Sequence, residues 1–161
     1  MSVLCKPRLI VPLIAVVASC VLAGPIVATA SASDTTIIKT VNHWSPIIGK
    51  DENKIAAAEH AFKLNRKAPP VIKSLKNEVG DLTHFAKQLK AQSASTSTGA
   101  KGRDDIAKGT LIIAGAYSQF AAELKHHPQG LSKQQIRANQ KTARKGHKKI
   151  VAGVTLLQRL A

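Results

Sequence analysis

The chain has 161 residues, with 24 lysines and arginines against nine aspartates and glutamates, and a formal net charge of +15. This length suits a single domain, and this charge favours contact with polyanions without specifying a fold. The two cysteines are Cys5 and Cys20, so the sequence after residue 20 excludes both a disulfide scaffold and a thiol nucleophile.

Residues 1–30 have the order of parts of a secretory signal peptide. Lys6 and Arg8 give a positive n-region, an apolar run extends from Leu9 to Ala23, and Ala28-Thr29-Ala30 supplies the small residues that signal peptidase requires. We expect cleavage after Ala30, with cleavage after Ala32 as a second register. The sequence therefore predicts a secreted or extracytoplasmic protein whose single helical domain comprises residues 31–161.

Two other readings of this segment compete with the signal peptide. Val17-Ala18-Ser19-Cys20 resembles a bacterial lipobox, which predicts processing before Cys20 and a membrane-anchored lipoprotein. The apolar residues that follow, Val21-Leu22-Ala23, are atypical of a lipoprotein. An uncleaved membrane helix is disfavoured because Gly24 and Pro25 interrupt the run before the roughly 20 apolar residues that span a bilayer.

The predicted mature chain carries a large positive charge for a small domain. Removing residues 1–30 takes away two of the 24 basic side chains, Lys6 and Arg8, and none of the nine acidic ones, which leaves a net charge of +13. At 131 residues the mature chain is long enough to bury roughly 65 to 70% of its unfolded surface without staples. Packing alone must then hold it together.

The mature sequence predicts an all-α domain, an antiparallel bundle of four or five helices, since no segment has a convincing period of two. A short first helix is expected from Asp34, bent or ended by Pro46 and stopped at Gly49. A second is expected from Asp51 to about Arg66, with Asp51 as its cap and the next residue, Glu52, in its first turn.

A third helix is expected to begin at the pair Pro69-Pro70, because proline suits the first turn of a helix. Its apolar seam advances by three and four residues along Ile72, Leu75, Val79, Leu82, Ala86 and Leu89. Residues 91–103 are rich in Ser, Thr and Gly and hold no large apolar side chain, which predicts a flexible loop within the single domain.

A fourth helix is expected to start at Asp104-Asp105. Its stretch 111–116 is apolar all round and is predicted to be the most buried part of the fold. Gly109 and Gly115 would each cost roughly 1 kcal/mol relative to alanine, which the close approach of another backbone would explain.

The last helix has the clearest start signal. Ser132 and Gln135 form a capping box, and Leu131 and Ile136 are placed as a hydrophobic staple. Its predicted inner face is Ile136, Gln140, Ala143, His147, Ile150, Val154, Leu157 and Ala161. Only the second half of that face is properly apolar, so we expect residues 150–161 to dock firmly and residues 133–149 to be held loosely.

The loosely held half carries a candidate anion-binding surface. Lys133, Arg137, Lys141, Arg144 and Lys148 advance by four, four, three and four residues, which defines the basic stripe; Lys145 and Lys149 lie further round the helix. From Lys125 to the end there are nine basic and no acidic residues. A solvated helix face is the plain interpretation, and a surface that neutralises repeated anions is the functional one.

The compartment decides which anions are candidates. We expect a non-enzymatic binding protein for anionic cell-envelope or extracellular material, such as teichoic acids or lipid head groups. Nucleic acid is the poorer candidate because no aromatic residue lies in the stripe for base stacking. The alternative is a module whose C-terminal helix completes a complex with a protein partner, motivated by Asn139, Gln140 and His147.

The sequence gives no sign of catalysis, and a hydrolase ranks third. There is no Gly-x-Ser-x-Gly elbow, no Glu-x-x-His and no His-Glu-x-x-His, and we predict no cofactor, metal site or small-molecule substrate. Asp51-Glu52 and Asp104-Asp105 are interpreted as helix-start residues. His60 and His84 are expected on exposed faces, whereas a metal site formed by His126, His127 and His147 is disfavoured by the surrounding lysines. His147 is expected to be half-buried, which lowers its affinity for protons.

Overall fold

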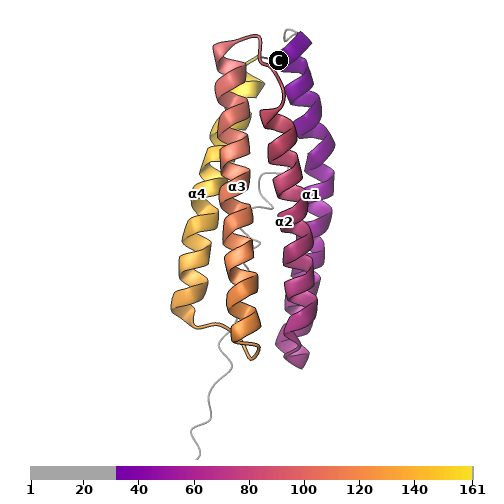
Figure 1. Cartoon of the computed structure of the whole chain (residues 1–161), viewed down its shortest axis with the longest axis vertical. Coiled ribbons are helices and arrows are strands. Elements are labelled where there is room, and N and C mark those ends of the chain that lie inside the picture. Colours follow the sequence, from indigo (N-terminus) through magenta and orange to yellow (C-terminus); the bar gives the residue numbers. More distant parts are fainter. Residues whose placement is uncertain (1–31, 161) are drawn as a thin grey trace, which may run out of the picture.

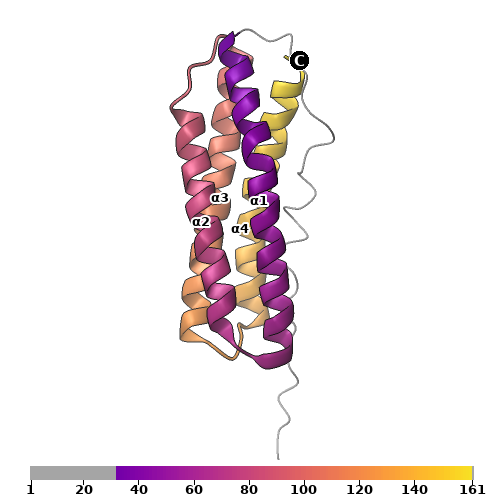
Figure 2. The ribbon, with the colours of Figure 1, turned by 90° about the vertical axis from the view of Figure 1, so that its right-hand side faces the viewer.

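The computed structural model describes residues 32–160 as four helices: α1 (Ala32–Asn65), α2 (Ala68–Lys90), α3 (Ser97–His126) and α4 (Lys133–Gln158). They run alternately up and down, with α1 and α2 on one side of the bundle and α3 and α4 on the other (Figures 1 and 2). The predicted all-α helical bundle is confirmed, with four helices. The predicted signal peptide, its cleavage point after Ala30 and Cys20 lie outside the described residues, whereas the second predicted cleavage point, after Ala32, follows the first residue of α1.

α1 is one continuous helix where the sequence predicted two. Pro46 lies inside it and Gly49 does not end it, although a proline in a helix interior costs about 3 kcal/mol. Buried side chains recur at helical spacing on both sides of Pro46, from Ile37 to Phe62. Packing along one continuous face therefore offsets the cost of the proline.

The continuity of α1 changes the interpretation of its acidic residues. Asp51 and Glu52 lie in the middle of the helix and are buried. The prediction that they cap a helix is wrong, because the amides of that part of α1 are already bonded within the helix.

α2 begins where the prolines predict, with Pro69 and Pro70 in its first turn. Between α1 and α2, Arg66 adopts the left-handed conformation at φ 57°. The buried seam of α2 is shifted by about one residue from the predicted one, so that Ile72 and Val79 are only partly buried. The buried residues of α2 are Ala68, Val71, Leu75, Glu78, Leu82, Phe85, Ala86 and Leu89.

α3 starts at Ser97 rather than at Asp104-Asp105, so the second half of the segment predicted as a loop is helical. Thr96 is the N-cap, and its hydroxyl accepts a hydrogen bond from the Gly99 amide at 2.9 Å. Asp34 of α1 accepts two further hydrogen bonds, from the Ser95 amide at 3.0 Å and the Thr96 hydroxyl at 2.8 Å. A carboxylate from another helix thus supports the start of α3.

Two pairs of glycines set the distance between α3 and α4. Gly102 and Gly109 lie on one face of α3, and Gly146 and Gly153 on one face of α4. A methyl group built on Gly109 would lie 2.5 Å from the carbonyl oxygen of Gly146, and one built on Gly153 would lie 2.5 Å from that of Gly102. The expected close approach of backbones is confirmed for Gly109 and wrong for Gly115, whose position faces open space.

α4 begins with the predicted capping box. The Ser132 amide donates to Gln135 Oε1 at 2.9 Å, and the Gln135 amide donates to Ser132 Oγ at 3.2 Å. The inner face of α4 differs from the predicted one. Glycine has no apolar side chain by which a hydrophobic pattern would detect it, yet it allows the closest contact between helices. The buried residues are Ile136, Asn139, Ala143, Gly146, Gly153 and Leu157. α4 therefore packs along its whole length, including the half that we expected to be held loosely.

The core consists of two hydrophobic clusters, one around Phe62, Leu75 and Phe120 and one around Ile37, Trp44 and Leu157. The stretch 111–116 is not uniformly buried as predicted, since Leu111 and Gly115 are exposed. Within the described range, no helix has the length and apolar character needed to cross a membrane.

Candidate functional site

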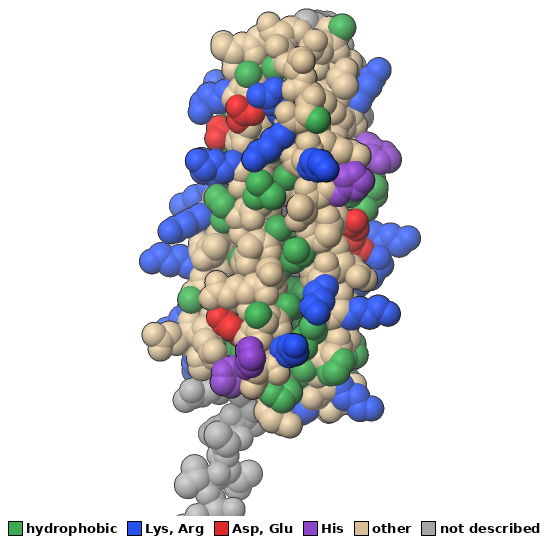
Figure 3. Space-filling view, viewed as in Figure 1, with side chains coloured by type: hydrophobic (Ala, Val, Ile, Leu, Met, Phe, Trp, Pro, Cys, Tyr) green, Lys and Arg blue, Asp and Glu red, His purple; other side chains and the backbone are tan. Residues whose placement is uncertain are grey.

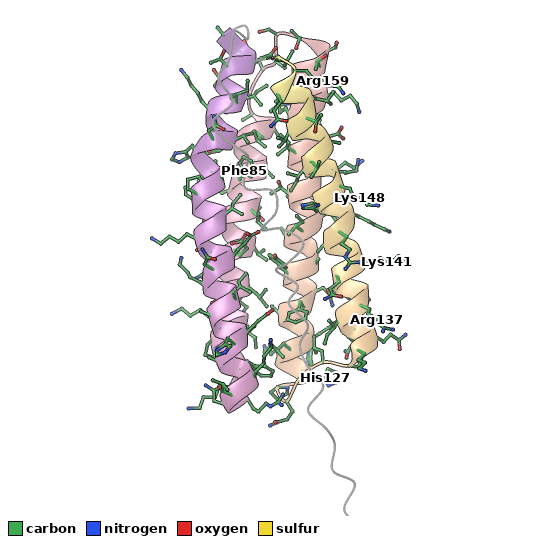
Figure 4. All side chains as sticks on the ribbon, turned by 180° about the vertical axis from the view of Figure 1, so that it is seen from behind. Phe85, His127, Arg137, Lys141, Lys148 and Arg159 are labelled. Atoms are coloured by element: carbon green, nitrogen blue, oxygen red, sulfur yellow. The ribbon has the colours of Figure 1, made fainter. Side chains whose placement is uncertain are left out.

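The basic stripe lies on the side of α4 that faces away from α3. Gly146 and Gly153 press the opposite side of the helix against α3, which turns the lysines and arginines outward. All five stripe residues are exposed, as is Lys145 beside them. Figure 4 shows Arg137, Lys141 and Lys148 one above another along α4.

Lys149 does not belong to this surface. Its ammonium group lies 3.6 Å from Asp105 of α3, and it is only partly exposed. The other six candidate residues form no ion pair with any described residue. The structure thus brings six of the seven predicted anion-binding residues together with their charges uncompensated.

The stripe surrounds an open depression on α4. Arg137, Gln140, Lys141, Arg144, Lys145 and Lys148 line it. At 1.5 Å per residue, the stripe from Lys133 to Lys148 extends about 22 Å along the helix. Exposed charges are screened beyond about 8 Å at physiological ionic strength, so one small anion would interact with only a few of these side chains.

Acidic side chains are held inside the bundle and basic ones outside. Of the nine acidic residues, five are buried: Asp34, Asp51, Glu52, Glu59 and Glu78. Asp104 is the one acidic residue classed as exposed, and its carboxylate pairs with Arg103 at 2.7 Å. Figure 3 shows the outcome on one face, where lysine and arginine side chains far outnumber acidic ones. The surface is therefore more positive than the net charge indicates.

Three buried glutamates and a tyrosine form a polar group that the sequence analysis missed. Glu52 and Glu59 of α1 are each 3% exposed, Glu78 of α2 is 0% exposed and Tyr117 of α3 is 1% exposed. Burial raises the pKa of Glu52 to about 7 and that of Glu59 to about 7, the latter against the opposing charge of Lys63. Burial, and then the charge of Glu52, raise the pKa of Glu78 to about 9.

Tyr117 lies within the electrostatic reach of all three glutamates. Burial first, and then the charges of Glu52, Glu78 and Glu59, raise the pKa of Tyr117 far above its usual range. Its hydroxyl has no hydrogen-bond partner among the described residues. The tyrosine therefore stays neutral and is available as a donor to a carboxylate.

Two more acidic residues meet at the solvent side of this group. Asp51 of α1 and Asp81 of α2 lie within hydrogen-bonding distance, and Lys54 contacts Asp51. Burial alone would raise the pKa of Asp51, but hydrogen bonds from Asp81 and Lys54 lower it. The hydrogen bond to Asp51 raises the pKa of Asp81. We call Asp51, Glu52, Glu59, Glu78 and Asp81 the carboxyl cluster.

One signal in the sequence could have revealed this cluster. Glu78 occupies a seam position of α2, between Leu75 and Leu82 at spacings of three and four residues. A charged residue there is either buried or breaks the apolar face. The predicted seam of α2 contained only apolar residues. It included Val79 in place of Glu78, so Glu78 was expected outside the core.

The six histidines lie on all four helices and in the turn after α3. His60 and His84 are exposed, as predicted, and so are His126, the last residue of α3, and His127, which follows it. His147 is half-buried on α4, and burial lowers its pKa, which confirms the expected direction. Across the described residues, no group of three or more histidine, cysteine, aspartate or glutamate side chains is placed to bind a metal ion.

Comparison of the chain with models of known protein families, with curated proteins and with solved structures finds no match to any of them.

Proposed function

We propose that this protein is a non-enzymatic binding protein for extended anionic material of the cell envelope or the extracellular space. The observation that carries the proposal is the row of six uncompensated basic side chains along α4, Lys133 to Lys148. Such a row neutralises repeated phosphates or carboxylates and gains affinity by releasing their counterions.

The dimensions of the row favour a polymer or a lipid surface over a small anion. Neighbouring stripe residues are three or four positions apart, which places their side chains about 5–6 Å from each other at the helix surface. The whole row is longer than two screening lengths at physiological salt. Only a ligand with charges repeated along about 22 Å engages all of it at once.

The positions of the aromatic residues argue against recognition of nucleic-acid bases. All five aromatic side chains, Trp44, Phe62, Phe85, Tyr117 and Phe120, are buried in the core. None is therefore available as a stacking platform for unpaired bases. Support for a partner module is weaker, because the Asn139 amide that motivates it already donates to Glu123 of α3 at 3.1 Å.

The test compares two variants of equal net charge. Arg137, Lys141, Arg144 and Lys148 are changed to glutamine in one, and the exposed lysines Lys39, Lys73, Lys76 and Lys87 of α1 and α2 in the other. Binding to polyglycerol-phosphate teichoic acid and to phosphatidylglycerol vesicles is measured from low to moderate salt.

The stripe variant is expected to lose affinity at low salt and to show a shallower salt dependence than the control variant. The slope of log K against log salt reports the number of neutralised phosphates. Equal losses in the two variants, or wild-type binding that salt leaves unchanged, would refute the proposal.

A further inference from the structure

The seam between α1 and α2 carries acidic side chains on both helices. Asp51 of α1 is within hydrogen-bonding distance of Asp81 of α2, and the charge of Glu52 of α1 raises the pKa of Glu78 of α2. Lys54 is the cation that contacts this group, and its side chain is 52% exposed. Acidic side chains of α1 therefore lie opposite acidic side chains of α2 in this seam.

Burial leaves several oxygen atoms of the inner carboxyl groups without hydrogen bonds. Both side-chain oxygens of Glu78 and one each of Glu52 and Glu59 have no partner within the described range, nor has the Tyr117 hydroxyl. An ionised carboxylate in such a place costs far more than a neutral one. The closed bundle is therefore compatible with the protonated side chains and opposed by the ionised ones.

We propose that the carboxyl cluster is a proton-operated latch: its three glutamates, when protonated, allow α1 to stay packed on the other helices, and loss of their protons releases α1. The released state gives each carboxylate water and separates the facing acids. Three of the five members, Asp51, Glu52 and Glu59, leave with α1.

The packing of the bundle makes α1 the helix that moves. The backbone of α1 lies close to that of α2 and is more distant from that of α3, whereas the backbone of α3 lies close to both α2 and α4. The glycine pairs join α3 to α4 backbone to backbone. Opening at α1 thus separates the helix with the fewest close backbone approaches to its neighbours and leaves three helices associated.

The charged groups around the latch set the direction and range of its response. Lys50, Lys54 and Lys63 of α1 and His84 of α2 favour ionised carboxylates; Tyr117 of α3 stays neutral. On α4, the half-buried titratable group is His147, whose pKa is lowered by burial, so that it gains charge only under acidic conditions. Its titration is therefore separate from an alkaline release.

The pH range follows from the three buried glutamates. Their pKa values rise from 4.5 to about 7, about 7 and about 9 on folding. The stabilisation by neutral side chains is complete below about 4.5 and is lost as pH rises through these folded values. The latch is closed at pH 5 to 6 and opens between about 7 and 9.

Trp44 provides a direct reporter of the seam. It is the single tryptophan of the chain, lies on α1, and is 5% exposed. Its ring stacks on Phe85 of α2 with centroids 5.9 Å apart, and its indole N–H donates to Gln88 Oε1 at 2.7 Å. Release of α1 transfers the indole from these contacts into water and moves its emission to longer wavelength.

The experiment records Trp44 emission wavelength and far-UV circular dichroism of the exported protein from pH 5 to 9.5. Wavelength is preferred to intensity because ring contacts, such as that of His84 edge-on to Trp44 at 5.3 Å, also affect the intensity of the indole emission. We expect the wild-type emission to shift between about pH 7 and 9 while most helical signal remains.

Two variants separate the latch from other effects of alkaline pH. Glu78→Gln keeps the shape of the neutral side chain and is expected to move the shift to higher pH; the variant with Glu52, Glu59 and Glu78 all changed to glutamine is expected to abolish it. Asp104→Asn, an exposed carboxyl outside the cluster, is expected to behave as wild type.

Three results would overturn the latch. They are a wild-type emission that stays constant to pH 9.5, a shift that Glu78→Gln leaves at the same pH, and a loss of helical signal that coincides with the shift. The last would mean that the whole bundle unfolds together. If the triple variant does not fold, Glu78→Gln alone decides the question.

Discussion

Replacing Gly109 with alanine tests the close packing of α3 on α4. The new methyl carbon would lie 2.5 Å from the Gly146 carbonyl oxygen and 2.8 Å from Ile150 Cγ1. Both distances are well inside van der Waals contact, and a backbone carbonyl cannot rotate away as a flexible side chain can. The two helices must therefore move apart.

The expected magnitude combines two opposing effects. Overpacking a tight contact costs typically about 1–3 kcal/mol, whereas replacing glycine with alanine in a helix gains about 1 kcal/mol. Gly115 lies on the same helix with open space at its Cβ position, so Gly115→Ala receives the gain alone. We expect Gly109→Ala to be less stable than Gly115→Ala by about 1–3 kcal/mol.

Urea unfolding followed by circular dichroism measures both variants against wild type. The comparison is internal, since both substitutions add the same methyl group to the same helix. A Gly109→Ala protein as stable as Gly115→Ala would show that α3 and α4 are not in backbone contact.

Two further predictions concern the start of α4 and the pH dependence of stability. Ser132→Ala removes one half of the capping box and is expected to lower the unfolding free energy by about 1 kcal/mol, with Ser118→Ala, an exposed serine within α3, as its control; an equal loss in both would contradict the role of the cap. Glu78→Gln is expected to match wild type near pH 5 and to exceed it at pH 8 in urea unfolding, because the pKa of Glu78 rises from 4.5 to about 9 on folding. The gain is bounded by about 1.4 kcal/mol for each pH unit above 4.5, and a gain that is the same at both pH values would refute the burial of an ionisable group.

The all-helical architecture and the starts of α2 and α4 could be predicted from local patterns. The prolines at the start of α2 and the capping box of α4 act through the first turn of each helix, and such effects are visible in sequence. The predicted break at Pro46 was wrong because the free-energy cost of a proline is local. The packing that offsets this cost involves the whole length of α1. The start of α3 was missed since part of its support, Asp34, comes from a residue some sixty positions earlier.

The two candidate sites differ in how far sequence could reveal them. The basic stripe follows from helical spacing alone, and only the separation of Lys149 by its contact with Asp105 required the structure. The carboxyl cluster depends on which residues of α1 and α2 face each other, and a search for apolar seams discards acidic residues at those positions. The inner face of α4 was mispredicted for a similar reason, because a search for apolar residues also discards glycine. Gly146 and Gly153 lie at the closest contacts between α3 and α4.

The buried glutamates also make unfolding a proton-releasing reaction. At pH 7 the folded chain retains protons on Glu78 and in part on Glu52 and Glu59, because burial raises the pKa of all three, whereas the unfolded chain retains almost none. The heat measured by calorimetry therefore includes the ionisation heat of the buffer that takes up these protons. An enthalpy of unfolding obtained in Tris will differ from one obtained in phosphate, although the protein undergoes the same transition in both.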